Sequence, residues 1–349
     1  GLALYLYIPV RAMSEPPVNW SNPRGLGETL DHVLRRQYGD LVKIPRSFGL
    51  FLVQMKFTAS AFIGQMSLAG FCAALIGGAF FLRRNRKLAF FFTFFILLSS
   101  AGFALVTNFD TTPAVLDVIR VFYLPAYLVA FLLAGAGTAW LLKTVISRKT
   151  AAAIPACALV CVLPLSLFLK NRAQNDRKHN HIAFDYGINV LNSMQQNAVI
   201  FALEDTPLYQ LAYLKYVEGM RPDVTVCDEN GTIFRTLFRQ GEKGIMYKQP
   251  LKKRVNEYLE SAIRSGRPVY HTLESGLSVN KDLKSTAEGM VYRVLGTGKD
   301  ADQDAVWRSF NFRGVDDPAV YKDIFTRDML ARYRLFRALV TVAVIAVAV

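Results

Sequence analysis

The sequence predicts a polytopic α-helical membrane bundle followed by a soluble α/β domain. The chain has 349 residues, of which 52% are hydrophobic, and its net charge is +14. Soluble proteins of this length are normally more polar. Four apolar runs have about the 20 residues that a membrane-spanning helix needs. After them, short apolar runs alternate with helical patterns, as they do in domains built from strands and helices.

Residues 1–10 are predicted to be the end of a transmembrane helix. Gly1–Pro9 is apolar, and no initiator Met, charged leader or cleavage site precedes it, so we expect an internal piece of a larger membrane protein. Residues 11–58 are predicted to form an extracytoplasmic loop. Within this loop, Gly27–Gln37 has the pattern of an amphipathic helix, and Gly49–Thr58, which carries Lys56, is expected to lie along the membrane interface.

Four transmembrane helices are predicted within residues 59–169. They are expected at Ala59–Leu82, Leu88–Thr107, Val115–Leu142 and Thr150–Leu169. The loop at residues 83–87 carries four basic residues and the loop at residues 143–149 carries three, whereas residues 108–114 carry none. Because short basic loops stay in the cytoplasm, residues 11–57 and everything after Leu169 are expected outside it.

Residues 170–323 are predicted to form an extracytoplasmic α/β domain with a small, mostly parallel sheet. Helices are expected at Ile182–Met194, Leu208–Gly219 and Leu251–Ser265, strands at Ala198–Leu203, Asp223–Cys227 and Pro268–Leu273, and an edge strand at Met290–Leu295. The strand–helix–strand spacing predicts parallel pairing with a right-handed crossover. Residues 324–349 predict a helix that either enters the membrane or starts a helical repeat, and the pattern favours the repeat.

Composition disfavours several classes of function. The positive charge is explained by Lys and Arg at helix ends that face anionic lipid, and no basic stripe with interleaved aromatic residues indicates nucleic-acid binding. The four cysteines and four histidines are scattered along the chain, and no Cys-x-x-Cys occurs. The spacing therefore predicts neither a disulfide framework nor a metal site.

Four stretches of the chain, taken together and in order, resemble a known family. They are PVRAMSEPPVNWSNP…HVLRRQYG at residues 9–39, VIRVFYLPAYLV at 118–129, DYGINVLNSMQQNAVIF at 185–201 and YLKYVEGMRPDVTV at 213–226. They are similar to the polytopic family with the DUF2723 domain, which includes the TMEM260-type protein O-mannosyltransferases of the GT-C class. The resemblance implies a GT-C-like bundle that moves a sugar, mannose in this family, from a polyprenyl-phosphate donor to protein hydroxyls.

The chain departs from this family in two places. The family has a longer acidic loop after the strand at Ala198–Leu203, where this chain has only Glu204-Asp205-Thr206-Pro207. The family's N-terminal helices and first outer loop are also absent from these residues. That loop carries the acidic residue expected to act in catalysis, so the catalytic group is unknown here and is expected outside this sequence.

Arginines and aromatic residues of the first loop are candidates for donor binding. A transferase that uses a lipid-phosphate sugar must hold a phosphate at the membrane face, and arginine does so with two parallel hydrogen bonds. Arg11, Arg35 and Arg36 are therefore candidates for the donor phosphate, and Trp20 and Tyr38 for sugar or lipid contact. The alternative is that the arginines extend to lipid headgroups and Trp20 belongs to the interfacial aromatic belt.

Arg120 is the fourth candidate for the donor phosphate. It lies about one turn inside the outer end of a predicted helix, where an ionisable residue is costly and often functional. Asp117, three residues earlier on the same face, is its alternative partner in a purely local ion pair. Tyr123 is a further candidate for sugar or lipid contact, although a structural role is favoured for it and for Pro125, which is expected to kink the helix.

The ends of two predicted strands carry acidic residues. Glu204 and Asp205 follow the first strand and Asp228 follows the second, at the edge where α/β folds bind ligands. They are candidates for a cation or sugar hydroxyls. Capping of the next helix by Asp205 or Thr206 is the favoured alternative. Asn19-Trp-Ser and Asn230-Gly-Thr have the spacing of N-glycosylation sites.

These observations predict an integral membrane glycosyltransferase, in a bacterial inner membrane or in the ER membrane of a eukaryote. Its expected partners are membrane lipid, a lipid-linked sugar donor and a protein acceptor. No cofactor beyond that donor is predicted, and the sequence leaves a need for divalent cations undetermined. The competing class is a non-enzymatic, membrane-anchored scaffold whose α/β domain binds partners, and a transporter ranks third.

Overall fold

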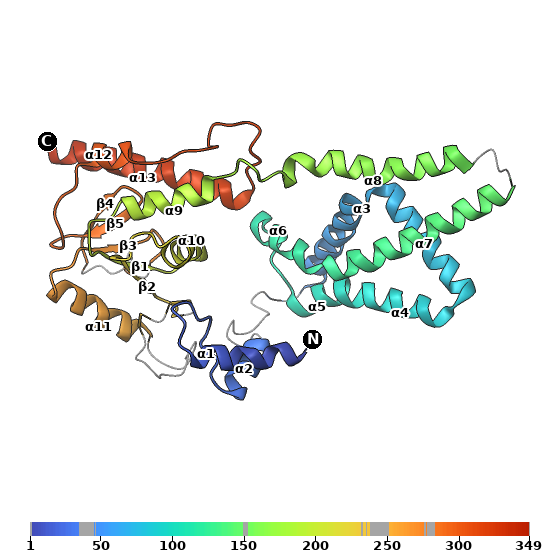
Figure 1. Cartoon of the computed structure of the whole chain (residues 1–349), viewed down its shortest axis with the longest axis horizontal. Helices are drawn as coiled ribbons and strands as arrows, with labels where there is room; N and C mark the ends of the chain where they lie inside the picture. The colour runs from blue at the N-terminus through green and yellow to red at the C-terminus, as the bar shows by residue number, and fades with distance from the viewer. Residues whose placement is uncertain are drawn as a thin grey trace. The chain divides into compact units, whose positions relative to one another are not determined.

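The computed structural model divides the chain into two units. The structure describes residues 2–34, 45, 47–148, 153–231, 233–234, 236–237, 251–275, 277 and 283–348. One unit, here the helical unit, comprises residues 40–175, and the other, the α/β unit, comprises residues 1–39 and 176–349. Figure 1 shows the elements of both.

The helical unit is built from long apolar helices. They are α3 (Phe48–Arg84), α4 (Arg86–Leu97), a π-helical turn (Leu98–Gly102), α5 (Phe103–Thr107), α6 (Pro113–Phe122), α7 (Leu124–Arg148) and α8 (Ala153–Asn175). Among the described residues, three helical stretches are long and apolar enough to cross a membrane: Phe48–Arg84, Arg86–Thr107 and Leu124–Thr144. Helix α8 is not among them, so the fourth predicted span, Thr150–Leu169, stays a prediction.

Helix α3 starts well before the predicted span at Ala59. Ser47 caps it, because its Oγ accepts a hydrogen bond from the Leu50 amide at 3.1 Å. The segment Gly49–Thr58 was expected to lie apart along the interface, but it is helical and packs into the bundle. The Gln54 side chain donates to the Phe109 carbonyl at 2.8 Å, and Thr58 lies 2.8 Å from the Tyr123 hydroxyl. Internal partners thus satisfy polar groups that an interfacial helix would turn to water.

The predicted helix Val115–Leu142 is two helices. Helix α6 ends at Phe122, Tyr123 forms the turn, and α7 starts at Leu124. Pro125 was expected to kink one continuous helix. It lies instead in the first turn of α7, where its missing amide proton costs no intrahelical hydrogen bond. The break therefore precedes the proline.

The described residues of the α/β unit form five strands and their covering helices. The helices are α1 (Tyr7–Met13), α2 (Leu26–Val33), α9 (Ile182–Asn192), α10 (Asp205–Tyr216), α11 (Leu251–Arg264), α12 (Gln303–Arg308) and α13 (Ile324–Ala348), with a 3-10 turn at Leu2–Leu6. The strands are β1 (Val199–Ala202), β2 (Thr225–Asp228), β3 (Val269–His271), β4 (Ser285–Glu288) and β5 (Val291–Val294). Gly219 and Gly266 follow α10 and α11 with positive φ, in agreement with the predicted helix ends.

The sheet is mixed, with the strand order β2-β1-β3-β5-β4. β1 pairs in parallel with β2 and β3, as the strand–helix–strand spacing predicts. β5 pairs antiparallel with β3 and β4. The prediction of an edge strand at Met290–Leu295 is therefore wrong, because β5 lies inside the sheet and β4 forms its edge. The predicted parallel pairing holds for β1 with β2 and β3, and the other two pairings are antiparallel. The polar sequence Ser285-Thr-Ala-Glu288 gave no apolar signal for β4.

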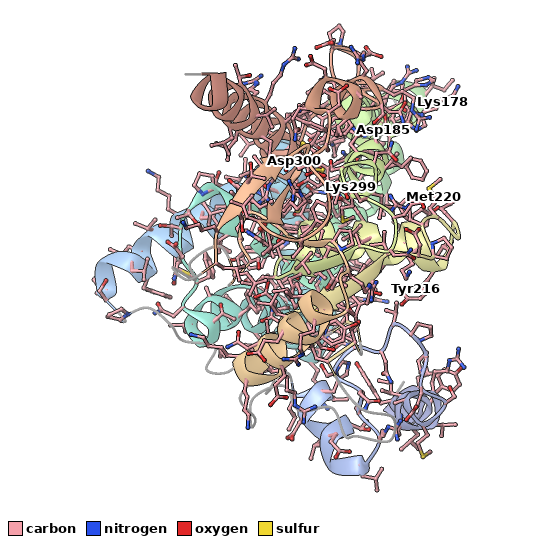
Figure 2. The ribbon with its side chains drawn as sticks, turned by 90° about the vertical axis from the view of Figure 1, so that its left-hand side faces the viewer. Lys178, Asp185, Tyr216, Met220, Lys299 and Asp300 are labelled. Atoms are coloured by element: carbon pink, nitrogen blue, oxygen red, sulfur yellow. The ribbon has the colours of Figure 1, made fainter. Side chains whose placement is uncertain are left out.

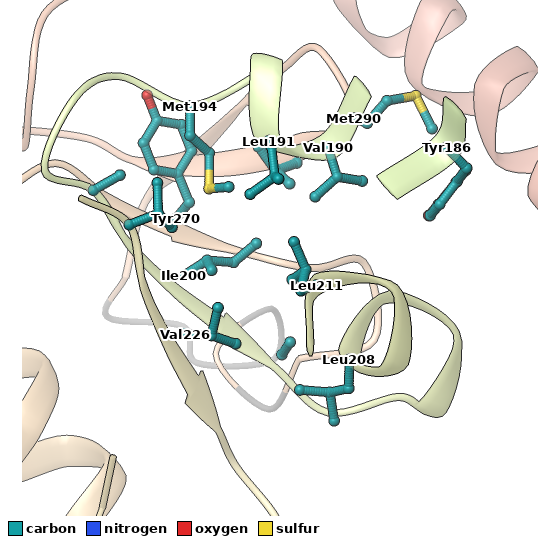
Figure 3. Packing of buried hydrophobic residues seen from close by; sticks show 14 of the residues in the cluster. Tyr186, Val190, Leu191, Met194, Ile200, Leu208, Leu211, Val226, Tyr270 and Met290 are labelled. Atoms are coloured by element: carbon teal, nitrogen blue, oxygen red, sulfur yellow. The ribbon is translucent and has the colours of Figure 1, made fainter. Parts of the chain in front are cut away.

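Helices cover both faces of the sheet. On one face, Ile200, Val226 and Tyr270 pack against α9, α10 and α13, and Figure 3 shows Val190 and Leu191 of α9 next to this face. On the other face, side chains of β1, β2 and β3 pack against α11. Figure 1 shows α11 on the opposite side of the strands from α9 and α13. The arrangement agrees with strands β1 and β3, in which every residue is buried, as in strands covered on both faces.

Helix α13 contributes to this core. Met329, Tyr333, Phe336 and Val340 are buried in the cluster that contains α9 and the strands. This part of the helix completes the α/β unit, although the predicted domain ended at residue 323. A helical repeat beyond it stays a prediction.

Candidate functional site

The turn between α1 and α2 is held by its own polar side chains. The side-chain nitrogen Nδ2 of Asn19 donates to Asn22 Oδ1 at 2.7 Å, and Arg24 forms an ion pair with Glu15. Glu15, Ser21 and Asn22 have positive φ, which is uncommon outside glycine. The sequence Ser14–Arg24 therefore folds into one defined shape.

Within the α/β unit, this turn packs against the segment that follows β2, in the manner of an added strand. Val18 forms an antiparallel bridge with Phe234, and the Asn19 amide donates to the Ile233 carbonyl at 3.0 Å. The Trp20 ring lies 5.6 Å from the Tyr209 ring of α10, measured between centroids. Asn19 is 8% exposed, so the first predicted glycosylation asparagine is buried in this fold. Trp20 keeps 40% of its surface exposed.

Asp228 orders the segment that receives the turn. It is fully buried at the end of β2. Its Oδ2 accepts from the Ile233 amide at 2.7 Å, and its Oδ1 accepts from the Asn230 amide at 3.0 Å. The carboxylate is thus used within its own loop, as in an Asx turn. Asp228 and Trp20, which the sequence suggested for separate sites, meet through residues 233–234.

Three tyrosines extend the surface that Trp20 begins. Tyr209, Tyr213 and Tyr216 are spaced i, i+4 and i+7 on α10, so they lie on one face of that helix. Each keeps between 39% and 46% of its surface exposed. We call Trp20, Tyr209, Tyr213 and Tyr216 the aromatic stripe. Figure 2 shows Tyr216 at the end of α10 near the N-terminal segment.

The aromatic stripe is anchored rather than loose. Tyr216 contacts the Phe234 ring at 5.9 Å and Tyr213 contacts the Phe184 ring at 6.3 Å. The Tyr213 hydroxyl donates to Glu218 at 2.5 Å, and this hydrogen bond raises the pKa of Tyr213. Half-exposed, fixed aromatic rings with polar ends suit the binding of sugar rings or of an extended polypeptide.

The carboxyl ends of β1 and β3 are filled by an arginine of α13. Arg332 contacts Glu204 after β1 at 2.6 Å, Glu274 after β3 at 2.9 Å and Asp328 at 2.8 Å. The Arg332 side chain is 10% exposed. This is the edge at which α/β folds bind ligands, since the chain leaves β1 toward β2 on one side and leaves β3 toward β4 on the other. Here the chain's own guanidinium neutralises the carboxylate that was a ligand candidate.

The three acidic candidates do not form one site. Glu204 faces Arg332, Asp228 faces its own loop, and Asp205 is exposed in the first turn of α10. The predicted capping by Asp205 or Thr206 is wrong, because α10 already starts at Asp205, and its N-cap residue Glu204 makes no side-chain capping hydrogen bond. Among the described residues, no group of three or more His, Cys, Asp or Glu residues is placed to hold a metal ion.

The basic candidates are likewise dispersed. Arg11, in the last turn of α1, donates to Ser14 Oγ at 3.1 Å. Arg120 pairs with Asp117 at 3.0 Å and lies 5.7 Å from the Phe57 ring centroid, so the local alternative for this residue is the arrangement seen. Both members of that pair are exposed. Three further candidates, Arg35, Arg36 and Tyr38, lie outside the described residues.

Tyr123 reaches no solvent in the helical unit. It is fully buried, its hydroxyl faces Thr58, and the rings of Phe62 and Tyr127 surround it. Contact with a sugar would require the bundle to open, and we propose no such role for it.

Polar residues of the family-like stretches serve the fold. The buried Asp185 of α9, labelled in Figure 2, accepts from the Arg313 side chain at 2.5 Å and from its amide at 2.9 Å. Arg221 donates to the Leu191, Met194 and Gln195 carbonyls at the end of α9, at 2.7, 3.0 and 2.8 Å. Arginine at a helix C-terminus satisfies free carbonyls and matches the helix dipole. Sequence reasoning had assigned no role to these arginines.

Two comparisons with known proteins give matches to this chain. Residues 183–236 match the family model described as TMEM260-associated domain 2. This span covers α9, β1, α10 and β2, and therefore all three tyrosines of the aromatic stripe. The chain is also 29% identical over 252 residues to the mouse (Mus musculus) protein O-mannosyl-transferase TMEM260, a match that covers 66% of this chain and 34% of that protein. No solved structure matches.

These two matches support a relationship to TMEM260-like proteins. The matched part amounts to about a third of the mouse relative's length. The apolar helices and the membrane-associated homologue together indicate a membrane protein.

Proposed function

We propose that the chain is part of a membrane glycosyltransferase that moves mannose from a lipid-phosphate donor to protein hydroxyls. The similarity to the mouse O-mannosyltransferase carries this proposal. A GT-C-like bundle would comprise the helical unit together with helices that precede it, and the acidic catalytic residue would lie in that preceding part. Arg11, Arg35, Arg36 and Arg120 remain the proposed contacts of the donor phosphate.

The aromatic stripe is our proposed acceptor surface. Its four rings are half-exposed and held by ring contacts, and its three tyrosines lie in the segment that matches the TMEM260-associated family. The packed turn adds Trp20 to the three tyrosines, so the loop that follows α1 and the α/β unit would bind the acceptor together. Aromatic side chains offer large contact area at low entropic cost, which suits unstructured polypeptide segments.

The test uses the complete reading frame expressed in cells that lack the endogenous transferase. Mannose transfer to an acceptor peptide is measured for Trp20→Ala, Tyr209→Ala and the control Phe325→Ala, an exposed aromatic on α13 outside the stripe. We expect the stripe variants to raise KM for the peptide about 5- to 30-fold, as loss of an interface aromatic costs roughly 1–2 kcal/mol. The control should match wild type.

Two results would contradict these proposals separately. If the parent protein transfers mannose and the stripe variants have unchanged KM, the acceptor surface lies elsewhere. If the parent transfers no sugar yet binds the peptide through the stripe, the protein is a membrane-anchored scaffold. The exposed aromatic stripe is the observation that supports this second function, partner binding by a membrane-anchored scaffold.

We also propose that the α/β unit is extracytoplasmic. Basic residues at positions 83–87 and 143–149 support this orientation. Cysteines introduced at Asn85 and Gln174 should differ in labelling by an impermeant reagent applied from outside, and equal labelling would reverse the proposal.

A further inference from the structure

Helices α3 and α7 touch backbone to backbone at two glycines. A Cβ on Gly77 would lie 1.9 Å from the Leu133 carbonyl oxygen, and a Cβ on Gly137 would lie 2.1 Å from that of Ala73. No side chain fits at this crossing. Small residues allow such close approach of helices in a membrane.

Beyond the crossing, the two helices leave an open pocket of about 420 Å³. It is lined by Ile76, Ala79, Phe80, Arg83, Arg84 and Trp140. The Phe80 and Trp140 rings are 6.4 Å apart, and Trp140 keeps 36% of its surface exposed. Two guanidinium groups and two aromatic rings thus line a space of the size that a small-molecule group occupies.

The pocket has an unbalanced positive charge. The helical unit, residues 40–175, contains thirteen Lys and Arg residues but only three acidic ones, Asp40, Asp110 and Asp117. Asp110 lies just beyond the helical stretch Arg86–Thr107, at the end away from Arg83 and Arg84. This stretch is roughly 30 Å long at about 1.5 Å per residue. In the described part of the chain, neither Arg83 nor Arg84 has an ion pair or side-chain hydrogen bond. The two guanidinium groups are therefore available to an anion from outside the described part of the chain.

The position of the pocket favours lipid as the source of that anion. Arg83 and Arg84 end a helix long and apolar enough to span a membrane, and basic residues at the ends of such helices face lipid headgroups. Exposed apolar side chains, Leu82 and Leu141, adjoin the lining residues and suit acyl chains. Basic pockets between transmembrane helices bind anionic headgroups in this way.

We propose that the α3–α7 pocket binds the headgroup of an anionic phospholipid. Arg83 and Arg84 hold the phosphate, and Trp140 packs against the glycerol backbone. This site is independent of the acceptor surface and of the proposed transfer reaction.

The test measures quenching of Trp140 fluorescence by lipid with brominated acyl chains. The chain carries Trp20→Phe and Trp307→Phe and is reconstituted with brominated phosphatidylglycerol or brominated phosphatidylcholine. We expect quenching at lower mole fraction with phosphatidylglycerol, and Arg83→Gln/Arg84→Gln should reduce this preference roughly fivefold per arginine. The control Arg86→Gln/Lys87→Gln removes the same charge outside the pocket lining and should keep most of it.

Three outcomes would overturn the proposal. These are no phosphatidylglycerol preference in the parent, an equal loss in both double variants, and full relief of quenching by about 10 mM inorganic phosphate. Equal loss would indicate diffuse attraction to the basic loop, and relief by phosphate would indicate a site for a soluble anion. Native mass spectrometry of the same samples counts bound lipid, so a change in Trp140 environment alone cannot mimic binding.

Discussion

Arginines in the two units of this chain have opposite surroundings. In the α/β unit, Arg332 and Arg293 are almost fully buried, and each contacts two or more carboxylates. In the helical unit, Arg83 and Arg84 are exposed and have no described partner. The buried arginines bind carboxylates of the chain itself, whereas the exposed arginines remain available to anions from outside the chain.

The difference teaches where to look for binding in such a protein. A charged residue at the expected ligand edge of an α/β sheet is a weak indication of function when a buried counter-charge reaches it. Glu204 lies at that edge and is satisfied by Arg332. A basic pocket at a helix end, whose arginines are exposed and have no described ion pair, is a stronger indication, because these charges remain available to an anionic ligand.

The largest effect should follow from removing the buried arginine. Arg332→Leu leaves Glu204 and Glu274 without their counter-charge, and we expect a loss of about 3 kcal/mol in the free energy of unfolding, near the low end for a buried pair because both carboxylates keep some exposure. Labelling of the buried Cys227 thiol during denaturant titration reports on this unit, once other cysteines are replaced by serine.

Arg334→Leu is the matched control on the same helix, since Arg334 is exposed. It should change stability by less than about 0.5 kcal/mol. Equal effects of Arg332→Leu and Arg334→Leu would show that the buried network contributes nothing specific.

The helical unit should be most sensitive at its glycine crossing. Gly137→Ala places a methyl group 2.1 Å from the Ala73 carbonyl oxygen, so the helices must separate, at a cost of about 2 kcal/mol. Gly135→Ala, where the added Cβ meets nothing within 4 Å, is the control and should be neutral or slightly stabilising. Unfolding by SDS, followed by circular dichroism, compares the two, and a stable Gly137→Ala variant would refute the close crossing.

A smaller effect should appear as acid sensitivity of the ion pair between Arg221 and Asp223, next to the end of α9. The hydrogen bond from Arg221 lowers the pKa of Asp223 to about 2, below its ordinary value of 3.8. The carboxylate therefore stabilises the fold above about pH 4, and this contribution is lost as the pH falls toward 2. Asp223→Asn should lower stability by on the order of 1 kcal/mol at pH 7, after allowance for solvent screening, and should lose less than wild type on acidification. Near-UV circular dichroism between pH 2 and pH 7 measures both, and identical acid profiles would remove Asp223 from this role.

Local signals account for what could be predicted. Apolar runs and punctuating glycines indicated β1, α10, β2, α11 and β3, because burial and turn chemistry act over a few residues. The polar strand β4 and the break at Tyr123 depend on partners elsewhere in the chain. The i, i+4, i+7 spacing of the three tyrosines was present in the sequence and could have indicated an aromatic face on α10.

The candidate site needed long-range contacts that no local pattern encodes. Val18 pairs with Phe234, and Glu204 pairs with Arg332. The first contact brings Trp20 beside Tyr209, and the second satisfies an expected ligand. The sequence therefore indicated Trp20 and Glu204 as candidates for ligand binding, but it did not indicate which residues each would contact.

The smallest expected stability change concerns Arg120, whose exposed pair with Asp117 contrasts with the buried network of Arg332. Exposed pairs contribute about 0–1 kcal/mol, so Arg120→Ala should leave the unfolding midpoint of the helical unit nearly unchanged.

If Arg120 also holds the donor phosphate, its loss should reduce mannose transfer by the complete protein about 30- to 1000-fold, since a charge-assisted contact in the transition state contributes roughly 2–4 kcal/mol. Arg120→Lys should restore only part, because a point charge replaces a fork of donors. Arg120→Ala/Asp117→Ala separates the two roles at matched protein levels. Wild-type activity in the double variant would assign Arg120 to the local pair alone, whereas a loss equal to that of Arg120→Ala, with Asp117→Ala active, would support contact with the donor.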